Sequence, residues 1–242
     1  IRVAAGTVCR QLLRALGIEV SGYVRAVGGA EDKGEYAFEE LSRRSADLMM
    51  MDEEAEKRAK QVIDDCAARG DTCGGVLELR VKGLKSGFGS CMTYAEKLDA
   101  RLIAALMSVQ AIKGAEVGLG FGVAARCGSG VHDEIFYDQT RGYYRKTNRA
   151  GGIEGGMSNG EEIVLRAAMK PIPTLMKGLE TVDYRTHEAV RAATERSDVC
   201  AIAACEVILE SALCCELAKV VLERLGGDRM EEIAKRYGEL PA

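Results

Sequence analysis

The chain has 242 residues, 47% of them hydrophobic, and a net charge of -4, so it can bury a substantial core as one large domain or two small ones. Acidic and basic residues are mixed along its whole length, which excludes the concentrated positive charge that nucleic acids and anionic membranes attract. No apolar run approaches the roughly 20 residues that span a bilayer, so we expect a cytoplasmic protein with no nucleic-acid or membrane partner.

The first predicted elements are a helix and a strand. Apolar residues at helical spacing predict a helix over residues 2–16, which Gly17 ends, and apolar-polar alternation predicts a strand over residues 18–26. The helix begins without an N-capping residue, so we expect a further segment before Ile1.

Further elements follow in the first half of the chain. Asp52 is placed to cap a helix that continues to Cys66. Residues 76–82 alternate, which predicts a strand with one apolar face and one solvated face that carries Glu78, Arg80 and Lys82. Residues 97–109 predict a buried helix that ends beside Gln110 and a second glycine cluster at residues 114–122.

The second half predicts a strand over residues 162–170, which the prolines at 171 and 173 stop, so that Lys170 stands at the strand end. A long amphipathic helix is predicted over residues 202–225, followed by a short one. Its expected outer face carries Glu206, Glu210, Glu216, Lys219 and Glu223. No Pro-rich or Ser-rich linker interrupts the chain, so we expect a single domain over residues 1–242 of the α/β or α+β class.

Residues 147–160 read TNRAGGIEGGMSNG, with five glycines among fourteen residues. Glycine reaches positive φ without steric cost and lets a ligand or another backbone approach closely. Two interpretations remain open on these residues alone: a tight hairpin loop, or a wall of main chain that contacts a ligand.

The nine cysteines and two histidines contain no CxxC pair, which argues against a zinc site, and no metal is expected. Cys66, Cys205 and Cys214 fall among apolar helix positions, as free thiols do in a reducing compartment. His132 and His187 have no spacing that ties them to a thiol. We therefore interpret all nine cysteines as structural.

Charged residues also gather at two element boundaries, in residues 170–174 and 195–198. Lys170 and Arg196 are suited to a phosphate or another anion near a helix N-terminus. The alternative is that Asp198 only caps the long helix and Arg196 is a solvated surface residue. The motifs GxGxxG and GxxxxGK[ST] are both absent, so a Rossmann or P-loop site is not supported.

Several sequence blocks, in order, resemble those of the chorismate synthases, and together they cover essentially the whole chain. The blocks are residues 2–6 (RVAAG), 70–76 (GDTCGGV), 97–100 (KLDA), 107–114 (MSVQAIKG), 147–152 (TNRAGG), 155–160 (GGMSNG), 170–172 (KPI) and 196–200 (RSDVC).

The resemblance implies an α+β fold, a three-layer β/α/β sandwich, assembled as a homotetramer. It also implies a lyase that ends the shikimate pathway, which leads to the aromatic amino acids. The reaction would be the 1,4-anti elimination of phosphate from 5-enolpyruvylshikimate 3-phosphate. Reduced FMN would take part without net redox change, with NADPH as a flavin reductant in some members.

The resemblance also implies site residues. The flavin pocket would be lined by Gln110, Ala111, Gly155, Lys170, Pro171, Ile172, Pro173, Thr174 and Arg196. Asp198 resembles the family aspartate that lies near the flavin N5, where it would assist proton transfer.

This chain departs from the family pattern at Leu119, where an aspartate is usual, and at Ser197, where many members have histidine. The family's two catalytic histidines and its phosphate-gripping arginines belong to a more N-terminal portion, which these residues do not match. A second hypothesis is therefore a non-catalytic fragment that keeps flavin binding or assembly. A third is an interaction module whose glycine loops are structural.

Overall fold

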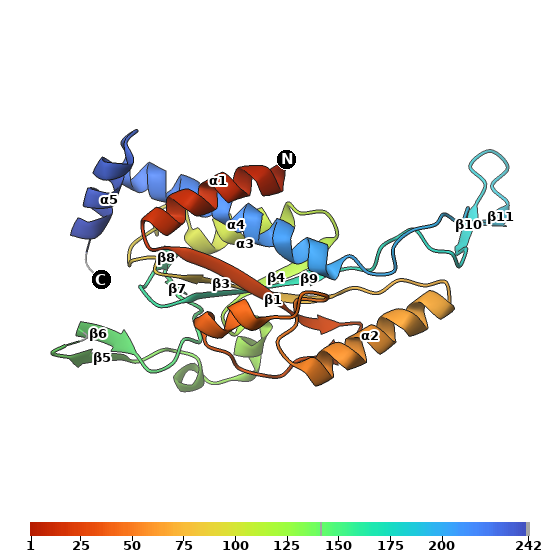
Figure 1. Ribbon diagram of the computed structural model, residues 1–242, viewed down its shortest axis with the longest axis horizontal. Coiled ribbons are helices and arrows are strands. Elements are labelled where there is room, and N and C mark those ends of the chain that lie inside the picture. The colour runs from red at the N-terminus through yellow and green to blue at the C-terminus, as the bar shows by residue number, and fades with distance from the viewer. Residues whose placement is uncertain (141, 241–242) are drawn as a thin grey trace.

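The computed structural model describes residues 1–140 and 142–240, and its centre is a five-stranded sheet (Figure 1). The strand order is β2-β1-β3-β9-β4, and every neighbouring pair is antiparallel. The strands are β1 (Glu19–Val27), β2 (Ala30–Glu31), β3 (Gly75–Lys82), β4 (Ile112–Val117) and β9 (Ile163–Met169). The strands predicted at residues 18–26, 76–82 and 162–170 are confirmed, whereas β4 forms where the sequence predicts only a glycine cluster.

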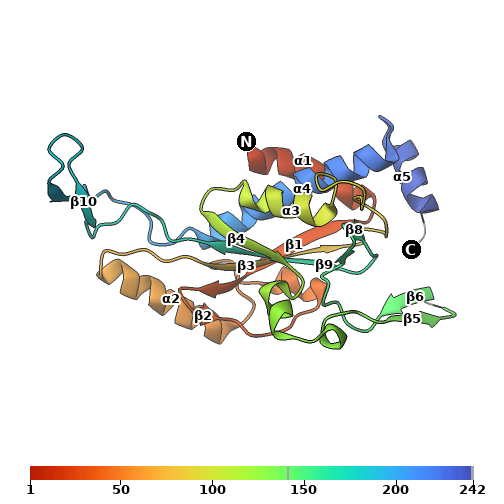
Figure 2. The same cartoon turned by 180° about the vertical axis from the view of Figure 1, so that it is seen from behind.

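Helices cover both faces of the sheet. The first face carries α1 (Arg2–Ala15), α3 (Leu98–Met107) and α4 (Ile202–Leu225), and the second carries α2 (Glu53–Ala68) and the 3-10 helix η1 (Phe38–Arg43), as Figure 2 also shows from behind. A short helix, α5 (Met230–Glu239), packs at the C-terminal end of α4. All five predicted helices are confirmed to within a few residues.

Local sequence signals explain two helix ends. The Asp52 carboxylate accepts a hydrogen bond from the backbone N–H of Ala55 at 2.6 Å, so Asp52 caps α2 as predicted. Gly17 adopts φ 77° directly after α1, a conformation that costs glycine little. These two signals mark where α2 begins and where α1 ends.

One expectation about the sheet is wrong. The face of β3 predicted to be solvated is covered, because Glu78 is 2% exposed and Arg80 is 9% exposed. The segment between β2 and η1 lies over this face, and the Arg80 guanidinium donates to the carbonyl of Tyr36 at 2.9 Å. Buried charges need partners, and here each finds an opposite charge on the same face.

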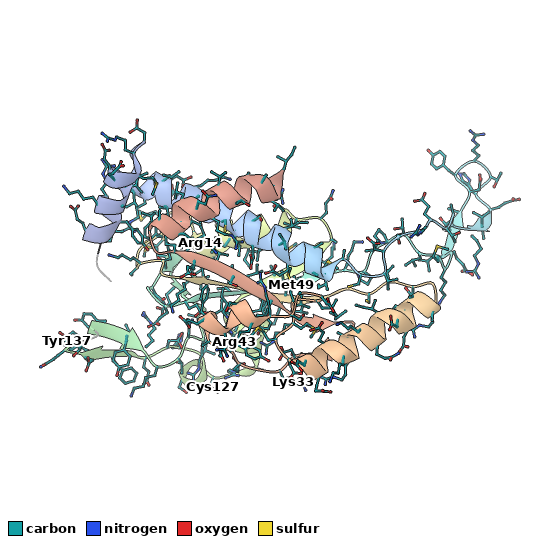
Figure 3. All side chains as sticks on the ribbon, viewed as in Figure 1. Arg14, Lys33, Arg43, Met49, Cys127 and Tyr137 are labelled. Carbon is teal, nitrogen blue, oxygen red and sulfur yellow. The ribbon has the colours of Figure 1, made fainter. Side chains whose placement is uncertain are left out.

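Hairpins and turns extend from this body. They are β5 (Ile135–Asp138) with β6 (Gly142–Arg145), β7 (Ile153–Glu154) with β8 (Met157–Ser158), and β10 (Glu180–Val182) with β11 (Ala189–Arg191). Two further 3-10 helices, η2 (Gly120–Ala125) and η3 (Gly128–Gly130), follow β4. Residues 171–200, here called the arm, project far from the sheet and carry β10 and β11, while Tyr137 marks the β5–β6 hairpin at the opposite end (Figure 3).

The main hydrophobic core lies between the sheet and the layer of α1, α3 and α4. Leu77, Leu165 and Leu209 are fully buried there. Each such side chain contributes roughly 1.5–3 kcal/mol through burial. Among the described residues, no helix is both long and apolar enough to span a bilayer.

Candidate functional site

A cavity of about 530 Å³ opens at the C-terminal end of β9, between the start of α1, the end of α3 and the start of α4. We call it the β9 cavity. Four predicted flavin contacts line it, namely Gln110, Ala111, Lys170 and Ile172. The other predicted site residues, Gly155, Pro171, Pro173, Thr174, Arg196 and Asp198, do not line it.

The charged side chains that line the β9 cavity are two cations, Arg2 and Lys170, and no carboxylate of the described residues lines it. Arg2 Nη1 donates to the Ser108 hydroxyl at 3.2 Å, and Lys170 Nζ donates to the Pro171 carbonyl at 3.4 Å. The sequence alone does not mark Arg2 as a site residue. Its only signal is its place at the start of the block at residues 2–6. The cavity is therefore suited to an anion.

Ala111 joins two of the predicted segments. It is one of three non-glycine residues with positive φ in the described chain, at 72°, and its carbonyl accepts the backbone N–H of Lys170 at 2.9 Å. A non-glycine residue in the left-handed region costs about 1 kcal/mol or more, and such residues gather at functional sites. The hydrogen bond fixes the segment after α3 against the end of β9.

Residues 170–174 and 196–198 lie side by side where the arm leaves the sheet, and we call them the arm base. The Ser197 hydroxyl donates to the Thr174 carbonyl at 2.7 Å. Just beyond, the Thr72 hydroxyl donates to the Ile172 carbonyl at 2.7 Å. The structure thus brings the two charged boundary segments together, as the sequence suggests.

Arg196 and Asp198 are both exposed at the arm base. In the described part of the chain neither forms an ion pair. The interpretation that Asp198 caps the long helix is wrong, because the N-cap of α4 is Ala201 and no side chain caps it. The flavin and proton-transfer roles of these two residues stay predictions.

The glycine segment at residues 147–160 forms the β7–β8 hairpin, with Gly155 and Gly156 in its turn at φ 59° and 83°. A Cβ on Gly151 would lie 2.4 Å from the backbone nitrogen of Gly118, so this glycine permits a close approach of two main chains. The hairpin interpretation therefore accounts for these glycines. A Cβ on Gly155 would meet nothing within 4 Å, so the surface of the turn is open.

The hairpin lies at the opposite end of β9 from Lys170. The carbonyl of Gly151 accepts the N–H of Val164 near the start of that strand, whereas Lys170 follows its last residue. A strand of this length spans about 20 Å. The structure therefore does not bring Gly155 to the β9 cavity, and its contact with a flavin stays a prediction.

Four buried or partly buried charges, Arg10, Arg44, Glu206 and Glu210, form a set that we call the α4 cluster. Arg44 Nη1 donates to Glu206 Oε1 and to Glu210 Oε1, each at 2.9 Å, and also to the carbonyl of Gly22. Arg10 Nη2 donates to Glu210 Oε2 at 2.5 Å. The cluster ties α1, β1 and Arg44, the residue after η1, to α4. The expectation that both glutamates lie on the outer face of the helix is wrong, because Glu206 is 0% exposed and Glu210 is 3% exposed.

The two carboxyl groups differ in protonation. Burial, followed by the neighbouring Glu210, raises the pKa of Glu206 to about 9, and its Oε2 atom has no hydrogen-bond partner among the described residues. Burial also acts to raise the pKa of Glu210, but hydrogen bonds from Glu206 and from the two guanidinium groups outweigh it and lower that pKa. At neutral pH the pair therefore holds one proton, on Glu206.

Most of the cysteines are buried or partly buried, as predicted from their apolar helix positions. All nine thiols are free. Burial raises the pKa of Cys73 to about 12 and those of Cys205 and Cys214 to about 11, so these thiols stay protonated and unreactive. Cys91 and Cys127 are exposed and do not belong to the core. The described residues contain no cluster that could hold a metal ion.

Known proteins match this chain over nearly its whole length. A family model described as chorismate synthase matches residues 1–222. The chorismate synthase of Geobacter sulfurreducens is 50% identical over 98% of this chain and 63% of its own length. That of Caldicellulosiruptor bescii is 46% identical over 98% of this chain and 63% of its own. The chain thus spans 63% of the length of these relatives.

A crystal structure of chorismate synthase has a TM-score of 0.81 to this fold at 36% identity, and the match covers 98% of this chain and 67% of that one. The predicted α+β class of the chorismate synthase type is confirmed by this likeness. In this chain the described residues form a five-stranded sheet with a layer of helices packed on it.

Proposed function

The chain belongs to the chorismate synthase family, and we propose that it carries out the reaction that gives the family its name. This reaction is the 1,4-anti elimination of phosphate from 5-enolpyruvylshikimate 3-phosphate to give chorismate, with reduced FMN and without net redox change. The observation that carries the proposal is the β9 cavity with its two cations, Arg2 and Lys170. Substrate and cofactor both carry phosphate, and cations without a competing carboxylate favour phosphate oxygens.

The residues of the β9 cavity fit a flavin. Apolar side chains of Val109, Ile172 and Ile208 line it, which suits a flat ring, and the main chain at Ala111 offers a rigid edge. We propose that Gln110, Ala111 and residues 170–174 hold reduced FMN. When bound, reduced FMN would supply electron density transiently to the substrate.

The arm base would complete this site. Arg196 is an exposed cation without an ion pair in the described residues, so its guanidinium is free to bind a phosphate or the negative charge of the reduced ring. Asp198, two residues away, is a free carboxylate that would hold or move a proton at the flavin face. The predicted flavin contact of Gly155, through the open surface of its turn, would lie apart from the β9 cavity, at the other end of β9.

We further propose a single domain over residues 1–242, a homotetramer, a cytoplasmic location and NADPH as a reductant of the flavin. The homotetramer and NADPH follow from the family resemblance, and the single domain and the location follow from the composition and pattern of the sequence. The formal charge of -4, spread along the chain, supports the absence of nucleic-acid and membrane partners.

A second candidate function is flavin binding or assembly without turnover. The matched region is 63% of the relatives' length. Flavin binding and turnover by these 242 residues must therefore be measured separately. Intact-mass measurement of the purified protein, compared with 26.0 kDa, establishes which chain an assay contains. Anaerobic titration with reduced FMN then separates the two functions. Flavin binding without chorismate would favour the second candidate.

The test of the proposed reaction combines reduced FMN and 5-enolpyruvylshikimate 3-phosphate under anaerobic conditions and measures chorismate and released phosphate. Asp198→Asn is expected to lower turnover by about 100-fold or more, as loss of a proton-transfer group does, while FMN affinity changes by less than about twofold. Asp228→Asn, at another exposed site, is the matched control. Absence of both flavin binding and chorismate would overturn the proposal.

A further inference from the structure

A second cavity, of about 430 Å³, lies on the opposite face of the sheet from α1, α3 and α4. It is lined by β1, β3 and β9 and by the loop at residues 147–149, and we call it the arginine cavity. Its charged lining residues are four arginines, Arg25, Arg80, Arg149 and Arg166, and three glutamates, Glu35, Glu78 and Glu162. The family resemblance assigns no role to this face.

The inner carboxylates of the arginine cavity are already paired. Glu78 Oε1 accepts from Arg80 Nε at 2.9 Å and from Arg80 Nη2 at 2.7 Å, and Glu78 Oε2 accepts from Arg25 Nη1 at 3.1 Å. Glu162 Oε1 accepts from Arg80 Nη1 at 3.1 Å. Arg80 therefore has its donors occupied. The Glu78 and Glu162 carboxylates neutralise the guanidinium charge at the floor of the cavity. Their oxygens are already hydrogen-bonded, so they have little capacity to bind a cation.

Three other guanidinium groups keep free donors. Arg25 Nη2 reaches no closer than 3.9 Å to Glu35, and Arg166 Nη1 lies 3.9 Å from Glu78, both too long for a hydrogen bond. Arg149 forms no ion pair in the described residues, and its Nη1 makes only long contacts of 3.4 and 3.5 Å to carbonyl oxygens. The free donors come from β1, β9 and the loop, and they converge on one space.

The loop that carries Arg149 is held in place by a buried acid. Asp133 is 7% exposed and accepts hydrogen bonds from the backbone N–H groups of Arg149 and Ala150, each at 2.9 Å, and from the Thr147 hydroxyl at 2.6 Å. These bonds lower the pKa of Asp133 despite its burial, which acts in the opposite direction. Arg149 is therefore presented to the cavity by an ordered backbone, which reduces the entropy lost when it binds a ligand.

The remaining carboxylate, Glu35, does not block the cavity. Its side chain is 85% exposed at the rim and makes no hydrogen bond to Arg25, so an incoming anion can replace it at little cost. Planar guanidinium groups bind phosphate oxygens through paired hydrogen bonds. A volume of about 430 Å³ is in the range of small-molecule sites and exceeds what a bare phosphate needs.

We propose that the arginine cavity binds a phosphorylated small molecule through Arg25, Arg149 and Arg166. This site is distinct from the β9 cavity. The two lie on opposite faces of the sheet, and on β9 the arginine cavity is lined by Val164 and Arg166, whereas the β9 cavity is lined by Met169. The inference does not depend on the proposed function.

Inorganic pyrophosphate is the probe for the test, titrated calorimetrically into the protein at low salt. Arg149→Ala is expected to weaken one binding event at least tenfold, because it removes a free guanidinium that has no structural ion pair to lose. Arg126→Ala, an exposed arginine outside the cavity, is expected to leave binding unchanged. Arg25 is unsuited to the test because it also holds the buried Glu78.

Lys170→Ala separates the two cavities, and it is expected to leave the Arg149-dependent event intact. Binding that survives Arg149→Ala unchanged would show that pyrophosphate does not bind through Arg149, and binding that Lys170→Ala alone abolishes would assign it to the β9 cavity. Either result would overturn the inference. Absence of any binding at millimolar pyrophosphate would overturn it as well. A urea denaturation curve for Arg149→Ala that matches the parent protein confirms that the variant is folded.

Discussion

The α4 cluster and the arm base are both sets of opposite charges, yet they are built in opposite ways. In the α4 cluster both carboxyl groups are nearly inaccessible to solvent and share the Arg44 guanidinium at 2.9 Å. At the arm base Arg196 and Asp198 are exposed and have no ion pair in the described residues.

The difference separates charges that hold the fold from charges that are available to a ligand. A buried pair that loses one partner leaves an uncompensated charge. Substitutions in the α4 cluster should therefore lower the free energy of unfolding. An exposed, unpaired charge contributes little to stability but keeps its donors free. Variants of the α4 cluster should therefore lose stability, whereas variants of the arm base should lose affinity for a ligand.

The largest effect is expected for Arg44→Ala. The change leaves two buried carboxyl groups and the Gly22 carbonyl without their shared donor. We expect a loss of about 3–5 kcal/mol in the free energy of unfolding, measured by urea denaturation. The adjacent Arg43, which lies on η1 (Figure 3) and whose side chain is 79% exposed, is the control. Arg43→Ala should cost less than about 0.5 kcal/mol. An equal loss of unfolding free energy in the two variants would contradict the claim that buried charges stabilise this fold more than exposed ones.

A smaller effect per pH unit is expected for the pH dependence of stability. Because the pKa of Glu206 is about 9 in the folded protein and lies at the ordinary carboxyl value in the unfolded chain, the unfolded chain loses its proton first as pH rises. Stability should therefore fall between about pH 4.5 and pH 9, with a contribution of up to about 1.4 kcal/mol per pH unit.

Glu206→Gln removes this titration while keeping a similar shape. Its stability should change less with pH than that of the parent protein, and it should exceed the parent's stability at pH 8. Glu195→Gln, at an exposed position, should follow the parent profile. If Glu206→Gln and the parent showed the same slope from pH 5 to pH 9, the proton would not reside on Glu206.

The smallest change in free energy is expected at the arm base. Arg196→Ala should lower the affinity for reduced FMN about tenfold, on the order of 1.4 kcal/mol, because it removes a free guanidinium from the proposed site. Its free energy of unfolding should stay within about 0.5 kcal/mol of the parent. Arg185→Ala, an exposed arginine near the tip of the same arm, is the matched control. Unchanged FMN affinity in Arg196→Ala would remove Arg196 from the site.

Local signals in the sequence predict the elements well. Apolar spacing places all five helices and three strands of the main sheet, and Asp52 marks the start of α2. β4 is missed because its residues, 112–117, follow a strained turn at Ala111 and include a glycine, which masks the alternation. Element positions depend mainly on residues that are near each other in the chain, so they can be read from it.

The candidate site is predicted in part. Lys170 and Gln110 lie together in the β9 cavity, and the two segments of the arm base meet as expected. The hairpin at Gly155 lies elsewhere, because glycines specify backbone shape and carry no information about which distant segment they face. Arg2 enters the cavity only because α1 packs beside the end of α3.

The sequence by itself determined the family, the order of the elements and the chemistry of the residues at their ends. The tertiary structure alone decided which charges are buried. A helix with one clear apolar stripe predicts a solvated opposite face. Yet α1, β1 and the Arg44 side chain cover that face of α4, and the segment before η1 covers the charged face of β3. The physical reason is that burial depends on a second surface, and the pattern within one element describes only its own.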